Sequence, residues 1–376
     1  MERKIAENRI ILLLFHKPLR QLDGQVKYTS QLIQALSKKY EVVIPSEGLF
    51  KLTARFDSSW LLRTFLVNLY LIVWIFLHLN SIKDQTKFAI MEDRYVIFPS
   101  FIIKSLGINI ISRISDWGRD YSKSIDLGSG NLQKLFLRYS AFYETFVKRY
   151  SRGVIVPSEN MKKNIEIECK CPVIVFPFCV DSKIFNSQSE CNLNFTDDLH
   201  DIYCVLVGNF SYPANLEMAQ FIIYNVARKT LEKDRRIKFV IVGKDSDLKF
   251  GHLNIENVAI LGVVRDLECV YSRCQIGLNP TNVPGGTSIK NIEYLTNGLY
   301  VVGTPQSSIG IVESENFIIS SREDFSEAIL NVADLVRSKG IKKLAREAER
   351  IREYYSFERN AEKLVEFVSK ILMEDF

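Results

Sequence analysis

The stretch NVPGGTSIKNIEYLTNGLYVVGTP, residues 282–305, carries the strongest structural signal in this chain of 376 residues. An apolar run ends at Asn279, Pro284-Gly285-Gly286 predicts a flexible turn, and a helix is expected to begin at Thr287 or Ser288. Glycines in such a turn let backbone N–H groups approach an anion, and the helix adds the positive end of its dipole. The pattern is typical of a phosphate-binding loop, although ordinary strand–turn–helix connections share it.

Four side chains in this stretch have the chemistry to bind a nucleoside diphosphate. Thr287 and Ser288 can cap the helix and can also donate to phosphate oxygens. Lys290 falls in the first helical turn, where its ammonium group can reach a diphosphate, and Glu293 follows one turn later on the same side. A carboxylate at that position can accept hydrogen bonds from ribose hydroxyls. The sequence therefore predicts a nucleotide site in this segment.

The sequence on both sides of this stretch alternates apolar strands with helical patterns. After residue 200, strands are expected over 202–207, 238–242, 258–261, 276–279 and 299–302, and helices over 216–227 and 289–295. Before residue 181, strands are expected over 10–15, 40–44, 88–91, 108–114 and 153–156, and helices over 26–37, 60–79, 94–105, 131–150 and 158–167. Such alternation indicates βαβ units and parallel sheets, so we expect an α/β protein with two Rossmann-like domains that face each other across a ligand-binding cleft.

A polar segment without periodicity separates the two halves. Residues 181–200 are rich in Asn, Ser and Asp and predict a linker. Charged amphipathic patterns over 344–355 and 358–372 predict two helices further along the chain. We expect an N-terminal domain over 1–197, a C-terminal domain over 198–355 and a terminal helical segment over 356–376.

The composition is that of a folded protein, with 47% hydrophobic and 25% charged residues. The net charge of +5 is uneven, because residues 1–197 hold 27 Lys and Arg against 19 Asp and Glu, and the remainder holds 22 against 25. A basic first half favours an anionic partner such as a phospholipid surface or a phosphate-bearing acceptor, or it reflects scattered solvated side chains. No dense basic stripe with interleaved aromatics is present, so nucleic acid is not an expected partner.

Cysteines and apolar segments bear on the location of the protein. The seven cysteines are odd in number and irregularly spaced, which favours free thiols in a reducing cytosol over a disulfide framework or a zinc site. The first apolar run, 10–15, is too short for a signal peptide. The apolar segment 60–79 is interrupted by Arg63, Asn68 and His78, so we expect a buried or membrane-surface helix rather than a span. The predicted location is the cytoplasm, either free in solution or at the membrane surface as a peripheral protein.

Residues 285–312 resemble the donor-binding segment of retaining glycosyltransferase family 4, the glycosyl transferases group 1, which has the GT-B fold. Other segments resemble the family in the expected order, and the resemblance covers roughly residues 150–376 while staying weak before them. These segments are VIVPSENMKKNI (154–165), VIVFPFCVDSKIF (173–185), VLVGNFSYPANLEMAQFI (205–222), FVIVGKD (239–245), NVAILGVVRDLECVYSRCQIGLNP (257–280) and YYSFERNAEKLVEFV (354–368). The last resembles the helix that packs back on the first domain in this fold.

The resemblance implies roles for individual residues of the central stretch. It implies that Glu293 binds the donor ribose. It implies that Lys290, with the backbone around Gly286, Thr287 and Ser288, holds the diphosphate and stabilises it as it departs, which makes Lys290 a candidate catalytic residue.

Other donor contacts implied by the resemblance come from three further loops. Gly208 and Asn209 would face the phosphates or the donor sugar. Gly262 and Val263 would lie near the base and contact it through the main chain. Gly24 would approach the diphosphate from the first domain.

Two positions depart from the usual pattern of the family. Gly285 stands where the family often has the first of two glutamates, which usually meets the donor sugar. Many members also have Arg and Lys after the position of Gly208, whereas this chain has Asn209-Phe210-Ser211-Tyr212-Pro213, so that cationic help to the leaving group is missing. A subgroup of the family has both changes.

Candidate acceptor-side and metal-binding groups have competing interpretations. Asp116, Trp117 and Arg119, in SRISDWGRDY (112–121), follow an expected strand at a place where a cleft residue would lie. Asp116 either orients or deprotonates an acceptor hydroxyl or serves as a cap or surface residue. His16 either faces the cleft or is structural. Asp245 and Asp247 resemble a metal-binding Asp-x-Asp, but beside Lys244 they are interpreted as a solvated turn. No metal is expected, because Lys290 and the helix terminus can neutralise the phosphates.

The sequence thus predicts a hexosyltransferase that moves a sugar from a UDP- or GDP-sugar to a hydroxyl acceptor with retention, in glycan or glycolipid synthesis. Its expected partners are the nucleotide sugar, which is a substrate rather than a cofactor, a glycan or lipid-linked acceptor, and a membrane surface through the N-terminal domain. Two alternatives stay open. One is a sugar-nucleotide 2-epimerase, and the other is a non-catalytic GT-B-fold protein that binds nucleotide sugar.

Overall fold

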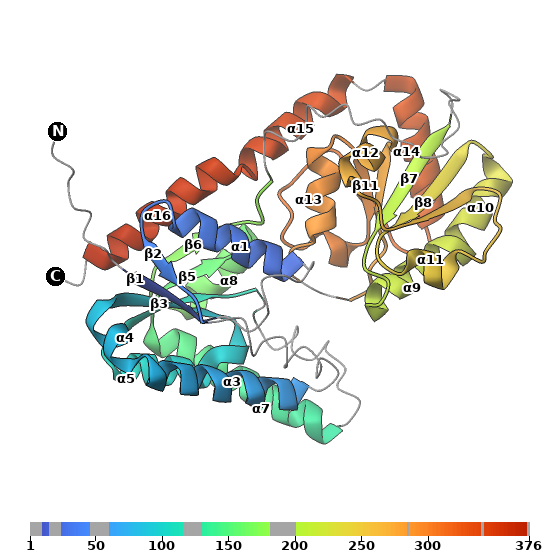
Figure 1. The fold of residues 1–376 in the computed structure, drawn as a ribbon. Coiled ribbons are helices and arrows are strands. Elements are labelled where there is room, and N and C mark those ends of the chain that lie inside the picture. The colour runs from blue at the N-terminus through green and yellow to red at the C-terminus, as the bar shows by residue number, and fades with distance from the viewer. Residues whose placement is uncertain are drawn as a thin grey trace. The chain divides into compact units, whose positions relative to one another are not determined.

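The computed structural model describes residues 10–14, 24–45, 60–115, 117, 130–180, 201–283, 286–339 and 342–373. The chain forms two compact units (Figure 1). Unit 1 comprises Met1–Cys179 and Phe357–Phe376, and unit 2 comprises Val180–Ser356. Each unit contains a six-stranded parallel sheet with helices, so the predicted α/β class with two sheet-containing domains is confirmed. The expected linker, 181–200, lies outside the described residues.

In unit 1 the six strands lie in the order β2-β1-β3-β4-β5-β6. Its described elements are β1 (Ile10–Leu14), α1 (Gly24–Leu36), β2 (Glu41–Val43), α3 (Trp60–Leu77), α4 (Leu79–Gln85), β3 (Thr86–Glu92), the short helix η2 (Arg94–Val96), α5 (Ile97–Ser105), β4 (Asn109–Arg113), α7 (Gly130–Tyr150), β5 (Ser151–Val156), α8 (Glu159–Glu168), β6 (Val173–Val175) and α16 (Phe357–Met373).

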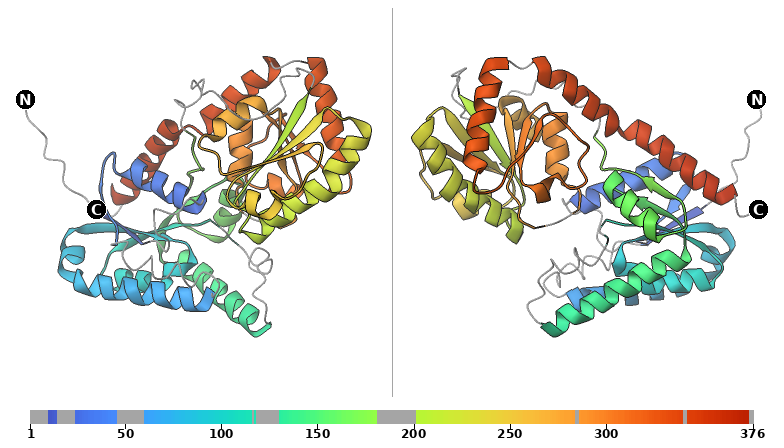
Figure 2. Two further views of the ribbon diagram at one scale, coloured as in Figure 1. Left: turned by 45° about the vertical axis from the view of Figure 1, so that its right-hand side comes forward. Right: turned by 180° about the vertical axis from the view of Figure 1, so that it is seen from behind.

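Helices cover both faces of the unit 1 sheet, with α1 and α16 on one face and α3, α5 and α7 on the other (Figures 1 and 2). The central strands are apolar runs because both of their faces are buried. The terminal helix packs directly on the sheet: a Cβ added at Gly153 of β5 would lie 2.4 Å from Ile371 of α16. Ser369 of α16 also bonds the Tyr40 hydroxyl at 2.6 Å.

In unit 2 the strands lie in the order β12-β11-β10-β7-β8-β9. Its described elements are β7 (Ile202–Val207), α9 (Pro213–Phe221), the π-helical turn η4 (Ile222–Val226), α10 (Ala227–Lys233), β8 (Ile237–Val242), α11 (Ser246–Phe250), β9 (Val258–Gly262), α12 (Leu267–Arg273), β10 (Ile276–Asn279), α13 (Ile289–Thr296), β11 (Tyr300–Gly303), η5 (Pro305–Ser308), β12 (Phe317–Ile319), α14 (Phe325–Lys339) and α15 (Lys342–Tyr354).

The core of unit 2 is divided between the two faces of its sheet. On one face, alternate residues of β7, Cys204 and Leu206, pack with α9, α10 and the Phe325 end of α14. On the other face, Gly277 of β10 leaves room for the Tyr294 ring of α13, since a Cβ at Gly277 would lie 2.2 Å from that ring. The side-chain alternation of the strands explains this division.

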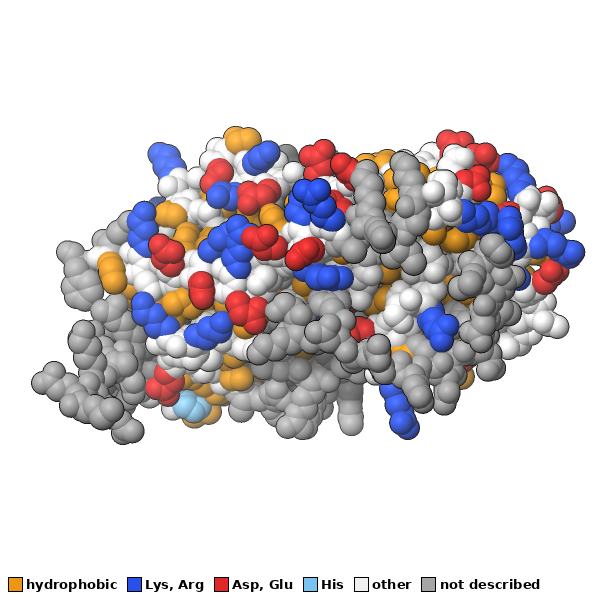
Figure 3. Space-filling model, turned by 90° about the horizontal axis from the view of Figure 1, so that it is seen from above, with side chains coloured by type: hydrophobic (Ala, Val, Ile, Leu, Met, Phe, Trp, Pro, Cys, Tyr) orange, Lys and Arg blue, Asp and Glu red, His pale blue; other side chains and the backbone are white. Residues whose placement is uncertain are grey.

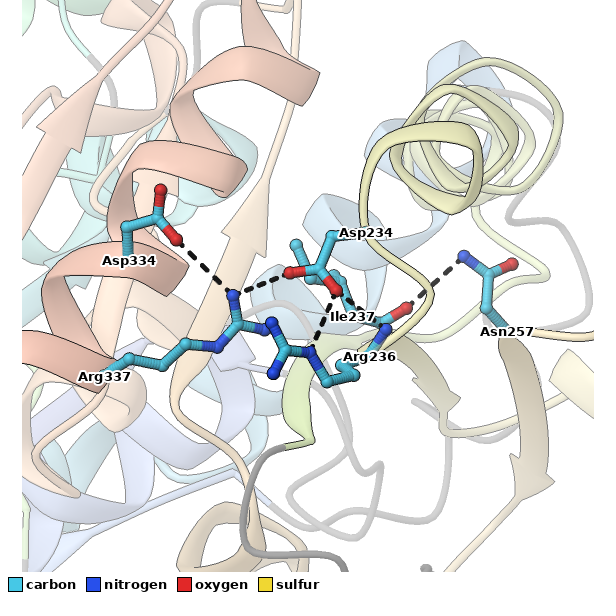
Figure 4. A network of polar contacts seen from close by, with 6 residues as sticks. All are labelled: Asp234, Arg236, Ile237, Asn257, Asp334 and Arg337. Carbon is cyan, nitrogen blue, oxygen red and sulfur yellow. Dashed lines mark hydrogen bonds and ion pairs between the residues drawn. The ribbon is translucent and has the colours of Figure 1, made fainter.

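A polar network fixes the edge of unit 2 at the α10–β8 turn (Figure 4). The Arg337 guanidinium of α14 donates to Asp234 at 2.6 Å, and the backbone N–H of Arg236 donates to the same carboxylate at 2.9 Å. Although burial alone would raise the pKa of Asp234, these hydrogen bonds outweigh it and lower the pKa. The side-chain amide of Asn257 donates to the carbonyls of Ala227 and Ile237.

Most strands expected from the sequence are present within one or two residues, but some elements were not expected. Strands β6 and β12 have three residues each, and α11, α12 and α14 were not predicted. The helix expected over 216–227 forms, but η4 interrupts it. The helix expected over 60–79 forms as α3 and the start of α4. No helix in the described ranges is both long and apolar enough to cross a membrane.

The prediction of free thiols holds for five cysteines and is wrong for one. Cys169, Cys171, Cys179, Cys204 and Cys274 are free. Cys269 is joined in a disulfide. Irregular spacing along the sequence gave no sign of this bond, because a disulfide depends on closeness in space.

Candidate functional site

The sheet of unit 2 has a topological switch point between β7 and β10. From β7 the chain adds β8 and β9 on one side, and then β10, β11 and β12 on the other. Ligands of doubly wound sheets bind outside the carboxyl ends of the strands at such a point. Strand β7 ends just before Gly208 and Asn209, and β10 ends at Asn279, which leads toward α13. Predicted donor residues from two separate segments therefore meet at the same edge of the sheet.

Asn215, a residue that sequence reasoning missed, bridges these two segments. The Lys290 ammonium of α13 donates to the side-chain oxygen of Asn215 at 3.0 Å. The amide nitrogen of the same side chain donates to the carbonyl of Asn209 at 3.0 Å. Its side chain also lies against Gly208, where an added Cβ would approach within 3.1 Å. The only available signal was a polar residue in the first turn of the helix after the Gly208 loop.

The Lys290 ammonium is a partly desolvated cation. Its side chain is half-buried, and among the described residues it makes no ion pair. Burial lowers the pKa of Lys290 to about 8, although the nearby Glu293 carboxylate opposes the shift. A bound anion would restore the charge balance that burial disturbs, so the position suits a diphosphate.

Glu293 is held by an aromatic donor from the neighbouring helix. The Tyr271 hydroxyl of α12 donates to the Glu293 carboxylate at 3.0 Å. Burial raises the pKa of Tyr271, and the negative charge of Glu293 raises it further, so the phenol stays protonated and keeps donating. One carboxylate oxygen is thereby fixed, and the carboxylate retains further acceptor capacity.

Helix α13 is fixed to the sheet beside the switch point. The backbone N–H of Val207, the last residue of β7, donates to the Tyr294 hydroxyl at 2.9 Å. The rings of Tyr294 and Tyr271 meet edge-on, with 5.7 Å between their centroids. Since Glu293 precedes Tyr294 directly, the anchoring of one residue sets the position of the other.

Ser288 occupies the predicted cap position of α13, but the prediction that its side chain caps the helix is wrong. Ser288 is the cap residue in extended backbone, but its side chain makes no capping hydrogen bond. Instead its hydroxyl accepts from the side-chain amide of Asn279 at 2.9 Å, and that amide also donates to Asn291 at 3.0 Å. The Thr287 hydroxyl oxygen is buried without a partner among the described residues. Among the described residues, neither Thr287 nor Ser288 therefore caps the first-turn N–H groups of α13 with its side chain.

Glycines end three neighbouring strands at this edge of the sheet. The N–H of Gly208 donates to Val242 at 3.0 Å, and the N–H of Gly243 donates to Gly262 at 2.7 Å. Gly243 has a φ of +130°, and a Cβ there would lie 2.0 Å from the Gly208 carbonyl oxygen. Gly262 has a φ of +66°, and Val263 after it is exposed. Close backbone approach at this edge thus depends on the absence of side chains.

The two aspartates interpreted as a solvated turn lie beside these glycines. Asp245 has a φ of 63° and precedes the short helix α11. Its carboxylate accepts a hydrogen bond from the Ser211 hydroxyl. The side chain of Asp247 lies against Gly262, 3.2 Å from where a Cβ would stand.

Unit 1 holds a buried charged cluster that sequence reasoning missed. Arg113 at the end of β4 donates to Glu92 at 2.6 Å and to Asp93 at 3.3 Å, and the side chains of Arg113 and Glu92 are both 3% exposed. The Tyr28 ring lies 4.2 Å from the guanidinium, and the Thr29 hydroxyl donates to Glu92. Although burial alone would lower the pKa of Arg113, the two carboxylates outweigh it and raise the pKa. The sequence signal was Glu-Asp-Arg directly after an apolar strand.

Asp93 of this cluster has a strained backbone. Its φ of 55° is uncommon for a residue with a side chain. Its backbone N–H donates to the Arg113 carbonyl at 2.9 Å, and its carboxylate accepts from the N–H of Ser115 at 2.7 Å. Strain of this kind concentrates at functional sites. The cluster lies at the carboxyl ends of β3 and β4, one strand away from the point between β1 and β3 where the strand order of unit 1 reverses.

The remaining predicted residues of unit 1 fall partly outside the structure. Asp116, Arg119 and His16 lie outside the described residues. Gly24 is the first residue of α1. Trp117 is half-buried with its ring edge-on to a tyrosine, and its indole nitrogen has no hydrogen-bond partner among the described residues.

The fold matches solved structures over almost its whole length. Sucrose-phosphate synthase from Thermosynechococcus elongatus has a TM-score of 0.66 at 14% sequence identity, and the match covers 98% of this chain and 100% of the synthase chain. HepE of Anabaena in complex with UDP has a TM-score of 0.66 at 12% identity, with 96% and 100% covered. A glycosyltransferase from Rickettsia africae has a TM-score of 0.64 at 13% identity, with 97% and 99% covered. The chain has the GT-B fold of glycosyltransferases.

The sequence comparison concerns unit 2. Residues 201–335 match the model of the family described as Glycosyl transferases group 1. No curated protein matches the chain. Unit 2 therefore carries a Glycosyl transferases group 1 domain, and the match includes the switch-point edge with Gly208, Lys290 and Glu293.

Proposed function

We propose that this protein is a hexosyltransferase that moves a sugar, with retention, from a UDP- or GDP-sugar to a hydroxyl group of a glycan or lipid-linked acceptor. The donor binds at the switch point of unit 2. The single observation that carries the proposal is the contact between Lys290 and Asn215, which holds a partly desolvated ammonium beside the Gly208 loop. A cation in that place stabilises the charge that develops on a departing diphosphate.

The donor contacts divide among three groups. Lys290 and the backbone around Gly286, Thr287 and Ser288 hold the diphosphate beside the N-terminus of α13, as at other helix N-termini. Glu293, oriented by Tyr271, accepts from the ribose hydroxyls. No metal ion is required in this arrangement, because the cation and the helix dipole supply the positive charge.

The other donor contacts come from the loops that follow β7 and β9 and from the start of α1. Gly208 and Asn209 face the phosphates or the sugar, and Gly262 and Val263 contact the base through the main chain. Gly24, at the start of α1, approaches the diphosphate from unit 1. The strand-end glycines support this part of the proposal, because they leave backbone groups accessible to a ligand.

On the acceptor side, we propose that Asp116 orients or deprotonates the acceptor hydroxyl. It follows the end of β4 by three residues, and β4 is anchored there by the buried contacts of Arg113 with Glu92. A strand end that is anchored in this way can hold a catalytic loop in a fixed position.

Solved structures of the same fold guide the choice of ligand. HepE has been solved with UDP and with UDP-glucose, and the pneumococcal O-GlcNAc transferase GtfA with UDP and GlcNAc. These ligands belong to those proteins, and they make UDP the first nucleotide to test here.

A thermal-shift panel of UDP, GDP, ADP and their sugar conjugates tests the proposal. A ligand at a hundred times its Kd stabilises the folded state by about 2.7 kcal/mol. We expect a shift with one nucleotide class that Lys290→Ala and Glu293→Ala each abolish or reduce. The matched control is Lys229→Ala, which removes an exposed lysine from α10 and should leave the shift intact.

The outcomes separate the proposal from its alternatives. If no nucleotide shifts the melting temperature, or if Lys290→Ala binds as well as the unaltered protein, the donor site is wrong. Binding without any slow hydrolysis of the bound donor favours a non-catalytic protein. Conversion of the donor sugar to its 2-epimer favours an epimerase.

A further inference from the structure

Three helices of unit 1 present an apolar face to the outside. Among the described residues, twenty large hydrophobic side chains are exposed, and eleven of them lie on α3, α5 and α7. These helices lie together on one face of the sheet (Figures 1 and 2). We call the exposed apolar side chains of these three helices the apolar face. A monomeric protein rarely leaves such a contiguous patch without a function.

Helix α3 supplies most of the apolar face. Phe65, Leu69 and Phe76 are exposed at helical spacing, whereas Val67 and Leu71 on the opposite side of the helix are fully buried. The same helix is therefore apolar on both sides. A helix that only packed on its own sheet would carry polar residues on its outer side.

The apolar face continues from α5 to α7. The ring of Phe98 on α5 is half exposed, and it lies beside Phe142 and Tyr139 of α7, with centroid distances of 6.4 and 6.3 Å. Leu135 is exposed two turns before Phe142 on the same helix. The exposed side chains of α5 and α7 thus form one surface rather than scattered positions.

The three helices are also strongly basic. Their sequences contain six Lys and Arg residues and one acidic residue, Glu144. Lys134 and Arg138, next to the apolar positions of α7, are exposed. By contrast, α16 on the other face of the sheet contains three acidic and three basic residues. Figure 3, which views the molecule from the α16 side, shows red and blue side chains interspersed there.

We infer that α3, α5 and α7 dock unit 1 onto the surface of an anionic phospholipid bilayer. Phenylalanine and leucine side chains on an in-plane helix bury in the boundary between headgroups and acyl chains, and flanking Lys and Arg bind the headgroups. The 18 residues of α3 give a length of about 27 Å along the surface. A second copy of the chain is a poorer occupant, because a two-fold interface would bring the two basic layers together.

Vesicle co-sedimentation of the full chain tests the inference. The probes are vesicles of phosphatidylcholine alone and vesicles with about 30% phosphatidylglycerol, each at about 0.15 M and 0.5 M salt. We expect binding to the anionic vesicles at the lower salt, and at least tenfold weaker binding to the neutral ones. Absence of binding to anionic vesicles, or equal binding to both kinds, would overturn the inference.

Two matched pairs of variants locate the surface. Phe65→Ser with Phe76→Ser removes side chains that are 61% and 60% exposed on α3, and should weaken binding at least tenfold. Ile167→Ser with Met373→Ser removes side chains that are 85% and 64% exposed elsewhere in unit 1, and should leave binding unchanged. Equal effects of the two pairs would contradict the assignment to the three helices.

Two further pairs of variants test how much the basic side chains contribute to vesicle binding. Lys134→Gln with Arg138→Gln should weaken binding to anionic vesicles several-fold, whereas Lys363→Gln with Lys370→Gln on α16 should not. Sedimentation velocity tests the alternative that a second copy of the chain covers the apolar face. We expect a monomer. A dimer that Phe65→Ser converts to a monomer would show that the apolar face binds a second copy rather than a bilayer. Nucleotide binding by unit 2 is measured separately, so failure of the bilayer inference and failure of the proposed transferase activity are distinguishable.

Discussion

The Lys290 ammonium lies 3.0 Å from the side-chain oxygen of Asn215, and this contact joins two helices that begin 76 residues apart. Asn215 follows the Gly208 loop, and Lys290 follows the loop after β10. A neutral partner adds no negative charge in contact with the Lys290 ammonium, whereas a carboxylate in the place of Asn215 would cancel the positive charge. The arrangement therefore preserves a cation for an incoming anion.

The affinity for UDP should fall as the pH rises through the pKa of Lys290. Burial lowers that pKa to about 8, so the ammonium is mostly protonated at pH 7 and mostly neutral at pH 9. We expect UDP to bind roughly tenfold more weakly at pH 9 than at pH 7, measured by calorimetry. Lys290→Arg, whose guanidinium stays protonated, should bind with an affinity that is flat over the same range. An equally steep profile in that variant would assign the effect to another group.

The same pKa predicts the opposite trend for the stability of the ligand-free protein. The folded state releases its proton near pH 8, and the unfolded chain releases it near the ordinary lysine value of 10.5. Between these values the unfolded state binds more protons, so this lysine makes the free energy of unfolding rise with pH. Urea unfolding of the unaltered protein and of Lys290→Met at pH 8 and 10 measures the difference. An unchanged pH trend in Lys290→Met would contradict the assignment.

Removal of the Tyr271 hydroxyl should weaken recognition of ribose. Tyr271→Phe removes the hydrogen bond of 3.0 Å that orients one oxygen of the Glu293 carboxylate. We expect UDP to bind about three- to tenfold more weakly, as for the loss of a hydrogen bond to a charged group. The preference for UDP over 2′-deoxy-UDP should shrink in Tyr271→Phe and disappear in Glu293→Gln. Equal discrimination in all three proteins would remove Glu293 from the ribose site.

Gly243→Ala should destabilise unit 2 by about 3 kcal/mol, because its Cβ meets the Gly208 carbonyl and its φ of +130° disfavours a side chain. Gly107→Ala in unit 1 is the matched control, with a φ of +83° but open space around its Cβ, and should cost about 1 kcal/mol. All three tryptophans, Trp60, Trp74 and Trp117, belong to unit 1. Gly243→Ala should therefore shift the circular-dichroism transition and leave the tryptophan-fluorescence transition in place.

Arg113→Met should destabilise unit 1 by about 3–5 kcal/mol, because it leaves the Glu92 carboxylate buried without its cation. The tryptophan-fluorescence transition measures this loss. Lys162→Met, which breaks an exposed pair on α8, should change the same transition by less than about 1 kcal/mol. If Arg113→Met combined with Glu92→Leu is no more stable than Arg113→Met alone, the uncompensated charge is not the cause.

The sequence predicts most of the strands, because buried parallel strands are continuous apolar runs that end at glycine or asparagine. Strands β6 and β12 were missed because three residues are too few to show a period. Helix α14 was not predicted, although its apolar residues recur at helical spacing. The residues of the candidate site on α13 were recognised from one continuous segment.

Contacts between distant segments could not be predicted in the same way. Asn215 and Lys290 are 75 residues apart, and no local pattern links them. The pairing of Arg113 with Glu92 depends on the adjacency of β3 and β4, which the sequence does not fix. The role of Ser288 differed from expectation because Asn279, nine residues earlier, occupies its hydroxyl.

Unit 1 is formed by two stretches of chain, and the whole of unit 2 lies between them in the sequence. During synthesis, residues 180–356 are complete and can close their own core while the place of α16 on α1 and β5 is still vacant. At that stage Gly153 and Tyr40 still lack their contacts with α16, which is synthesised later. Unit 1 is thus the first unit to be synthesised in part and the last to complete its fold. A nascent chain that stalls within unit 2 exposes the apolar surface that α16 would cover, and chaperones can bind to that surface.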